Sequence, residues 1–218
     1  GVNDFGDLGD ITNSELIIAN KGSNNLLSFN GGTGKSNGVL LSVDEGGFSF
    51  RSEIRVAASG EIYFIAFSDV MRFDRLSQNL DVVIDRGDIY TNFPNHLLFK
   101  DNADLILNSG ANPNRLSQFV KGHRLEVNQL TSSEFEEGLR GMILRLENEL
   151  LVVSRDQNRI IHFNTDSLTL NNVFSEGAHF DLPEHIVQGP ERNFYVSNVG
   201  SNNIVKLSTN GDFVSNFV

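Results

Sequence analysis

Short apolar runs bounded by polar turn residues recur along this chain at nearly constant spacing. A second apolar run follows each of them and ends in a large apolar residue. The first runs begin 46, 43, 45 and 44 residues apart, at Glu15, Glu61, Asp104, Glu149 and Asn193. The second runs end 44, 46, 44 and 44 residues apart, at Phe29, Phe73, Phe119, Phe163 and Leu207. Two independent registers that agree this closely over five copies indicate a repeat of about 44 residues.

Each repeat predicts β-strands rather than helices. The runs are short, rich in Ile, Leu, Val, Phe and Tyr, and bounded by Gly, Asn, Asp or Ser, which is typical of strands. One further apolar segment precedes each pair of runs and another follows it, so each repeat predicts a four-stranded antiparallel meander. The predicted units cover residues of about 5–47, 48–91, 92–135, 136–178 and 179–218.

The near-continuous apolar runs also predict how the sheets pack. A run such as Leu150–Val153 indicates a strand that is covered on both faces. Radially stacked sheets cover both faces of each sheet. We therefore predict an all-β fold, a β-propeller of about five four-stranded blades in a single domain over residues 1–218, or part of a larger propeller.

The last repeats carry a resemblance to a known family. Residues 183–218, PEHIVQGPERNFYVSNVGSNNIVKLSTNGDFVSNFV, resemble the NHL-type propeller repeat in their Pro, short strand, polar turn, Tyr-Val strand, Asn-rich turn and Asn-Gly hairpin. Residues 147–174 are similar. The resemblance, which extends to bacterial extracellular repeats, implies a propeller fold. It leaves the activity open, because such propellers serve as protein-binding, RNA-binding and catalytic scaffolds.

Composition narrows the classes of function. The chain has no cysteine, which excludes disulfides, thiolate catalysis and zinc-thiolate sites. Its net charge of −11, without a basic patch, disfavours nucleic acid as a partner. No apolar stretch approaches the roughly 20 residues that span a bilayer, so membrane insertion is not expected. The absence of Cys, the richness in Asn and Ser and the family resemblance favour a secreted or cell-surface protein.

One end of the predicted blades collects the candidate binding loops. The loops between blades and the loops after each second strand lie at the same end of an up-and-down meander. The inter-blade loops are acidic and carry the aromatic residues Phe48, Tyr90, Phe135 and Phe180, which either plug the space between blades or stack on a ligand. The second-strand loops are rich in amide side chains, including two copies of Gly-Ser-Asn-Asn, at 22–25 and 200–203. These copies suit either turn formation or ligand binding. The candidate ligand-binding residues are Asn24, Asn25, Tyr90, Asn114, Asn158, Asn202 and Asn203.

A second candidate site lies where the innermost strands begin. The repeat register places carboxylates and imidazoles there, with Arg140 as the one cation among them. These residues are Asp7, Glu53, His96, Glu184 and His185. A mixed set of carboxylates and imidazoles suits a metal ion or acid–base catalysis. If the site binds a hard cation such as Ca²⁺, we expect the carboxylates to supply the ligands. The alternative is that the carboxylates pair with Arg140 and water.

These observations favour a non-catalytic binding module that uses its acidic, Asn-rich end to bind a protein or a glycan. One alternative is a metal-dependent lyase or hydrolase that acts at the mouth of the central channel. Another is a structural subunit of an extracellular assembly, which would show a large apolar contact with a neighbour.

Overall fold

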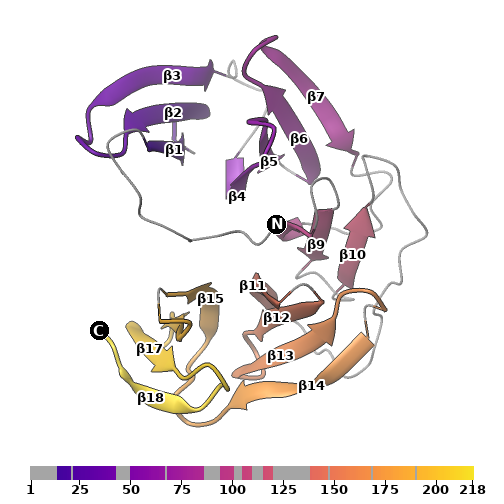
Figure 1. Cartoon of the computed structure of the whole chain (residues 1–218), viewed down its shortest axis with the longest axis vertical. Coiled ribbons are helices and arrows are strands. Elements are labelled where there is room, and N and C mark those ends of the chain that lie inside the picture. Colours follow the sequence, from indigo (N-terminus) through magenta and orange to yellow (C-terminus); the bar gives the residue numbers. More distant parts are fainter. Residues whose placement is uncertain are drawn as a thin grey trace. The chain divides into compact units, whose positions relative to one another are not determined.

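The chain folds into antiparallel sheets that follow one another in sequence order (Figure 1). The computed structural model describes residues 14–20, 22–42, 50–66, 68–85, 94–100, 105–109, 115–119, 138–146, 148–167, 169–189 and 191–218. The strands of the first two sheets are β1 (Glu15–Asn20), β2 (Asn25–Asn30), β3 (Ser36–Ser42), β4 (Phe50–Val56), β5 (Ile62–Ala66), β6 (Asp69–Asp74) and β7 (Asn79–Ile84). Those of the other three sheets are β8 (Pro94–Phe99), β9 (Leu105–Ser109), β10 (Arg115–Phe119), β11 (Leu139–Leu146), β12 (Glu149–Ser154), β13 (Arg159–Asn164), β14 (Thr169–Glu176), β15 (Pro183–Gln188), β16 (Phe194–Asn198), β17 (Asn203–Leu207) and β18 (Phe213–Asn216).

Each of the five predicted repeats forms one sheet in which consecutive strands pair. Three sheets have the predicted four strands, β4 to β7, β11 to β14 and β15 to β18. The other two, β1 to β3 and β8 to β10, have three strands within the described residues. The strand predicted before β1, near residue 8, and the strand predicted after β10, at residues 124–128, lie outside that part of the chain. Among the described residues, no helix is long and apolar enough to cross a membrane.

The sheets belong to two compact units, one formed by β1 to β7 and the other by β8 to β18. In the first unit, the core combines Leu26 of β2 with Ile62, Phe64 and Phe73 of the next sheet. A polar contact supplements this packing, since both Nη atoms of Arg75 reach the carboxylate of Glu15, at 2.7 and 2.9 Å.

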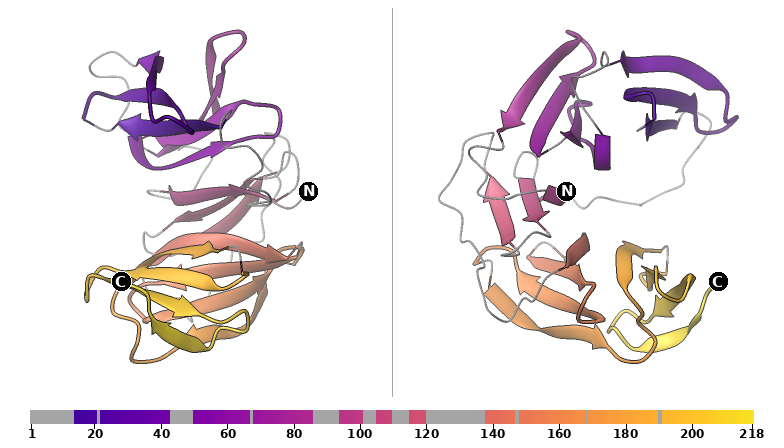
Figure 2. Two further views of the ribbon diagram at one scale, coloured as in Figure 1. Left: turned by 60° about the vertical axis from the view of Figure 1, so that its left-hand side comes forward. Right: turned by 180° about the vertical axis from the view of Figure 1, so that it is seen from behind.

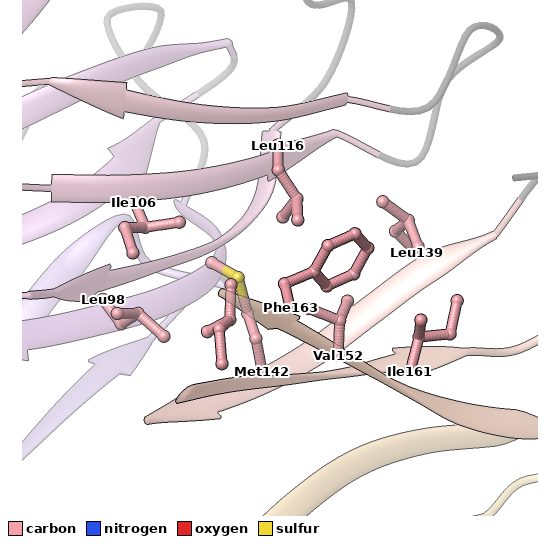
Figure 3. Close-up of a cluster of buried hydrophobic side chains, with 9 residues drawn as sticks. Leu98, Ile106, Leu116, Leu139, Met142, Val152, Ile161 and Phe163 are labelled. Atoms are coloured by element: carbon pink, nitrogen blue, oxygen red, sulfur yellow. The ribbon is translucent and has the colours of Figure 1, made fainter. Parts of the chain in front are cut away.

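In the second unit, β12 is buried on both faces, as the run Leu150–Val153 predicts. Leu150 and Val152 join a cluster with side chains from the β8 to β10 sheet (Figure 3). Leu151 and Val153 point the other way and pack with side chains of the β15 to β18 sheet. All four side chains are 0% exposed. Figure 2 shows the β11 to β14 and β15 to β18 sheets as neighbours.

The first strand of each four-stranded sheet, and β8 in the third sheet, pairs irregularly near its start. Register shifts fall between Pro94 and His96 in β8 and between Pro183 and His185 in β15. In both strands a side chain of the next strand accepts the backbone N–H of the histidine: Asn108 Oδ1 at 3.1 Å from His96 N and Ser197 Oγ at 3.2 Å from His185 N. These register shifts are β-bulges, which redirect side chains. Each of the two bulges includes a histidine, His96 in β8 and His185 in β15.

Gly141 allows two of these first strands to approach each other closely. It lies in β11, which contacts both β8 and β15. A Cβ atom at residue 141 would lie 2.8 Å from His185 Cα and 2.9 Å from the carbonyl oxygen of Glu184. Because both are backbone atoms, no side-chain rotation relieves such a contact.

We expect Gly141→Ala to lower the free energy of unfolding by about 1–3 kcal/mol, the usual cost of overpacking, because β15 must move away from β11. Urea denaturation followed by far-UV circular dichroism measures the change. Gly22→Ala is the matched control, since a Cβ there meets only Asn20 Oδ1, at an ordinary 3.6 Å. Equal effects of the two substitutions would show that the β11–β15 approach is not tight.

Candidate functional site

Two histidines from different sheets meet at the start of the first strands. The rings of His96 in β8 and His185 in β15 lie edge to face, with their centroids 4.8 Å apart. His96 is 5% exposed, whereas His185 is exposed. The strand between them, β11, has Gly141 at the equivalent position of the repeat, so no side chain separates the two rings. We call His96 and His185 the histidine pair.

The carboxylate next to the histidine pair, that of Glu184, takes part in two ion pairs. The carboxylate of Glu184 lies 3.5 Å from Arg140 Nε and 3.2 Å from Arg155 Nη1. The alternative that a carboxylate of this set pairs with Arg140 holds for Glu184. The second-strand loop of the same sheet brings a further cation, Arg155, to the same carboxylate.

The predicted metal site is only partly assembled in the described residues. His96 and His185 come together, but the carboxylate of Glu184 is held by two arginines. Glu53 pairs with Arg55 in the other unit, and Asp7 lies outside the part of the chain that is described. Within that part, no three His, Asp or Glu residues are grouped so that they could hold a metal ion. The carboxylates that are described have guanidinium partners instead, so calcium binding stays a prediction.

A hollow of about 630 Å³ opens at the loop end of the last sheet. It lies between the loop that leads into β15, the turn between β16 and β17, and the edge strand β18. We call it the loop hollow, and its lining residues are Ala178, His179, Phe180, Asp181, Ser201, Asn203, Phe213 and Asn216.

A buried amide holds the two loops of the hollow together. Asn198, 3% exposed, accepts the backbone N–H of Asp181 at 3.2 Å and donates to the carbonyl oxygen of His179 at 2.9 Å and to Asn203 Oδ1 at 2.8 Å. The carboxylate of Asp181 lies over Gly200, where a Cβ would be 2.3 Å from Oδ1. Both loops are thus fixed before any ligand arrives, which lowers the entropic cost of binding.

Aromatic rings form one wall of the loop hollow. His179 stacks on Phe213 with a centroid distance of 4.9 Å and an interplanar angle of 29°, and Phe213 remains 46% exposed. Burial lowers the pKa of His179 below its usual value of 6.5, so this imidazole is neutral at pH 7. Phe180 is 4% exposed and belongs to the core between the last two sheets. It plugs the space between sheets, as one of the two interpretations predicts. Phe48, Tyr90 and Phe135 lie outside the described residues.

Turn geometry explains the two Gly-Ser-Asn-Asn copies. Asn24 and Asn202 have left-handed φ angles of 48° and 52°, a conformation that Asn tolerates. In both copies the serine Oγ donates to the second asparagine Oδ1 at 3.0 Å, from Ser23 to Asn25 and from Ser201 to Asn203. The first copy therefore acts as a turn, while Asn203 of the second also lines the loop hollow.

Of the other predicted ligand-binding residues, only Asn158 lies in the described part of the chain, and it has a structural role. Asn158 also has a left-handed φ of 50°, and its Oδ1 accepts the backbone N–H of Leu182 at 2.8 Å. It therefore links the β12–β13 turn to the loop that leads into β15. Tyr90 and Asn114 lie outside the described residues.

Phe213 and Asn216 of β18 were not among the predicted site residues, and His179 and Asp181 were predicted only as members of an inter-blade loop. The last two residues had a usable signal, because the loop 175–181 mixes a carboxylate with aromatic residues. Phe213 and Asn216 had no such signal, because no repeated feature of the outermost strand marks its residues as lying near the loops.

Comparisons with known proteins identify the fold. No family model and no curated protein matches the chain, but solved structures do. The nidogen/laminin complex contains a chain with a TM-score of 0.72 and 12% identity, covering 93% of this chain and 75% of that one. Regucalcin from Agrobacterium tumefaciens, a calcium-binding protein, matches with a TM-score of 0.71 and 13% identity over 95% and 71%.

A third similar structure is a catalytically inactive histidine-to-alanine variant of virginiamycin B lyase from Staphylococcus aureus with quinupristin. Its TM-score is 0.71 and its identity 16%, covering 93% of this chain and 66% of that chain. The fold is a β-propeller. The chain thus spans about two thirds to three quarters of the length of the propellers it matches. At these identities the likeness shows the fold alone, and the closer resemblance to NHL-type repeats stays a prediction.

We expect Asn158→Ala to destabilise the propeller more than Asn202→Ala, by about 1–2 kcal/mol. Both substitutions remove an asparagine from a left-handed turn position, but only Asn158→Ala removes the hydrogen bond to the Leu182 N–H, and an unsatisfied amide costs about that much. Urea unfolding of both variants measures the difference. Equal losses would mean that the Asn158–Leu182 bond adds nothing to stability.

Proposed function

We propose that this propeller is a binding module that takes a neutral saccharide in the loop hollow. The observation that carries the proposal is the composition of that hollow. An exposed aromatic ring, Phe213, stands beside Asp181, Ser201 and Asn203, whose side chains offer hydrogen-bond acceptors and donors. Small-molecule sites combine apolar and aromatic side chains with a few fixed polar groups, and the loop hollow presents both kinds.

Charge supports a neutral ligand over an anionic one. Asp181 makes no ion pair with any described residue, and the neutral His179 adds no positive charge to the hollow. The chain also carries a net charge of −11, so a phosphate or nucleic acid would be repelled. A protein ligand, the other class expected from the sequence, would be recognised by the same loops and is an outcome of the test below.

We expect the protein to bind at least one member of a panel of glucose, galactose, mannose, N-acetylglucosamine and their short oligomers. NMR chemical-shift changes at His179 report binding at the hollow. Phe213→Ala should weaken the affinity about tenfold, because the ring that stacks on the sugar is lost. Asp181→Ala should weaken it similarly by removing a charged acceptor.

Val214→Ala is the matched control, because Val214 adjoins Phe213 in β18, is 52% exposed and does not line the hollow. It should leave the affinity unchanged. Absence of binding across the panel, or binding that Phe213→Ala leaves intact, would refute the saccharide proposal and make a protein the better candidate.

The histidine pair supports a second candidate function, acid–base catalysis of a lyase or hydrolase type. Two imidazoles in contact, one buried and one exposed, can divide the roles of base and acid. Virginiamycin B lyase is named as a lyase, and its histidine-to-alanine variant is described as catalytically inactive. The described residues form no group of three possible metal ligands. If the protein is an enzyme, these residues therefore favour acid–base catalysis by the two imidazoles.

Quinupristin is the probe for this candidate. If the histidine pair is catalytic, incubation should produce a new chromatographic peak, and His185→Ala should remove the activity while leaving the circular dichroism spectrum intact. His162→Ala is the control, because His162 is bound to Asn172 in the β13–β14 hairpin. Unchanged quinupristin would exclude this substrate. Conversion that survives His185→Ala would exclude the histidine pair as its catalyst.

A further inference from the structure

Four hairpins of the chain, β2–β3, β6–β7, β13–β14 and β17–β18, are closed in the same way. A polar side chain at or next to the end of the first strand accepts a backbone N–H group of the turn, as Asn, Asp and Ser side chains commonly do. The accepting atoms are Asn30 Oδ1, Asp74 Oδ1, Asn164 Oδ1 and Ser208 Oγ. Residue 74 follows residue 30 by 44 positions, and residue 208 follows residue 164 by the same number. The repeat itself therefore supplies the closing residue.

In the β17–β18 hairpin this arrangement leaves the side chain of Asn210 without a structural role. Ser208 Oγ accepts the backbone N–H groups of Asn210 and Asp212, at 3.2 and 3.1 Å. The Asn210 side chain is exposed and makes no hydrogen bond with any described residue. The same position of the β6–β7 hairpin holds Leu76, which is 96% exposed. A side chain at this position of the turn therefore points into solvent.

The residue after Asn210 is Gly211, and an exposed Asn-Gly pair can react with itself. The Gly211 backbone nitrogen attacks Cγ of Asn210 and forms a five-membered succinimide ring. The Cγ–Nδ2 bond breaks, and the former amide leaves as ammonia with the proton of the glycine N–H. Water then opens the ring at either carbonyl, which gives aspartate or isoaspartate. Glycine favours the attack because it has no Cβ to crowd the nitrogen.

Two further Asn-Gly pairs, Asn30-Gly31 and Asn37-Gly38, provide an internal comparison. The side chain of Asn30 is held by Thr33, whose backbone N–H and hydroxyl both donate to Asn30 Oδ1, at 2.8 and 2.9 Å. The side chain of Asn37 donates from Nδ2 to Ser28 Oγ at 2.9 Å. Each of these bonds must break before Cγ can turn toward the next backbone nitrogen. The Asn210 side chain has no such bond to lose.

The backbone of Gly211 packs directly on the neighbouring β11 to β14 sheet. Its carbonyl oxygen accepts the Ser175 hydroxyl at 2.6 Å, and a Cβ at residue 211 would lie 2.3 Å from the carbonyl oxygen of Phe174. In Figure 1 this turn lies against β14. An isoaspartate at residue 210 inserts one methylene group into the main chain just before this contact. The tight approach leaves no room for it unless the turn moves.

We propose that Asn210 is a site of spontaneous modification, which converts to aspartate and isoaspartate through a succinimide with Gly211, and that the isoaspartate form loosens the docking of the β17–β18 turn on β14. Water is the only co-reactant, and ammonia is the only product released. Phe213 follows the turn by two residues and lines the loop hollow, so the movement reaches that hollow.

The first test follows the modification itself. The whole chain is incubated at mildly alkaline pH, and peptide mapping by mass spectrometry measures aspartate and isoaspartate at each Asn-Gly pair. We expect Asn210 to convert at least about fivefold faster than Asn30 or Asn37, the factor that corresponds to about 1 kcal/mol for one side-chain hydrogen bond. Conversion of Asn210 at the same rate as the other two, or more slowly, would overturn the proposal.

Two variants test the cause of the difference. Asn210→Gln keeps an exposed amide but would need a larger ring, so residue 210 should stay unmodified. Ser28→Ala removes the acceptor that holds Asn37, so Asn37 should convert faster while the rate at Asn210 stays the same. Circular dichroism establishes that both variants are folded. An unchanged rate at Asn37 in folded Ser28→Ala would contradict the explanation by side-chain hydrogen bonds.

The second test follows the consequence for the fold. Chromatography separates the isoaspartate form, and its urea midpoint is compared with that of Asn210→Asp, which adds the same charge without lengthening the main chain. We expect a lower midpoint for the isoaspartate form only. In Ser175→Ala, which already lacks the hydrogen bond to Gly211, isoaspartate should lower the midpoint less. Equal midpoints for isoaspartate and Asn210→Asp would show that the turn does not move.

The NMR signals of the His179 ring, which stacks on Phe213, report whether the movement reaches the loop hollow. They should shift in the isoaspartate form and stay in place in Asn210→Asp. Unshifted signals in both would contradict this part of the proposal. The measurement needs no ligand, so its outcome is separate from that of the saccharide experiment.

Discussion

The structure depends on burying each middle strand on both of its faces. β12 shows the constraint most clearly, since Leu150 and Val152 pack on one neighbouring sheet and Leu151 and Val153 on the other, all without exposure. Burying one such side chain contributes about 1.5–3 kcal/mol, so the four together contribute on the order of the whole net stability of a domain. A sheet of this kind therefore gains much of its stability from the neighbours that cover its two faces, and this burial stacks the repeats.

Stacking places the starts of the first strands close together, and local irregularities decide what meets there. The bulges in β8 and β15 turn His96 and His185 out of the regular alternation, and Asn108 and Ser197 satisfy the backbone N–H groups that the bulges leave over. Gly141 then removes the side chain that would stand between the rings. The histidine pair is thus a product of sheet packing, two bulges and one glycine.

The sequence predicted the parts of the fold that the repeat period determines. The period, the meander and the two-faced burial of Leu150–Val153 follow from local patterns, so the strands of five sheets could be placed in advance. The sequence placed His96 and His185 in one ring of residues at the starts of the innermost strands. It did not predict that the two imidazoles contact each other, because the bulges in β8 and β15 leave no recognisable pattern in the sequence. Arg155 was missed at Glu184 because a long side chain reaches across from a second-strand turn. Phe213 was missed for a related reason, since its position in β18 depends on a register shift between Lys206 and Leu207.

Candidate function arises where the chain departs from its own repeat. The turn formed by Gly-Ser-Asn-Asn is the same in the first and last sheets, down to the serine-to-asparagine hydrogen bond, so the motif itself is structural. What differs is its surroundings. The positions that pair in their hairpins as Phe213 pairs with Leu207 hold Leu170 in the fourth repeat and Ser36 in the first, so neither of these two hairpins has an aromatic ring there. Likewise, the position of His96 and His185 holds Gly141 in the intervening repeat. A repeated scaffold supplies equivalent turns at equal intervals, and differences at single positions around one of them make it the candidate site.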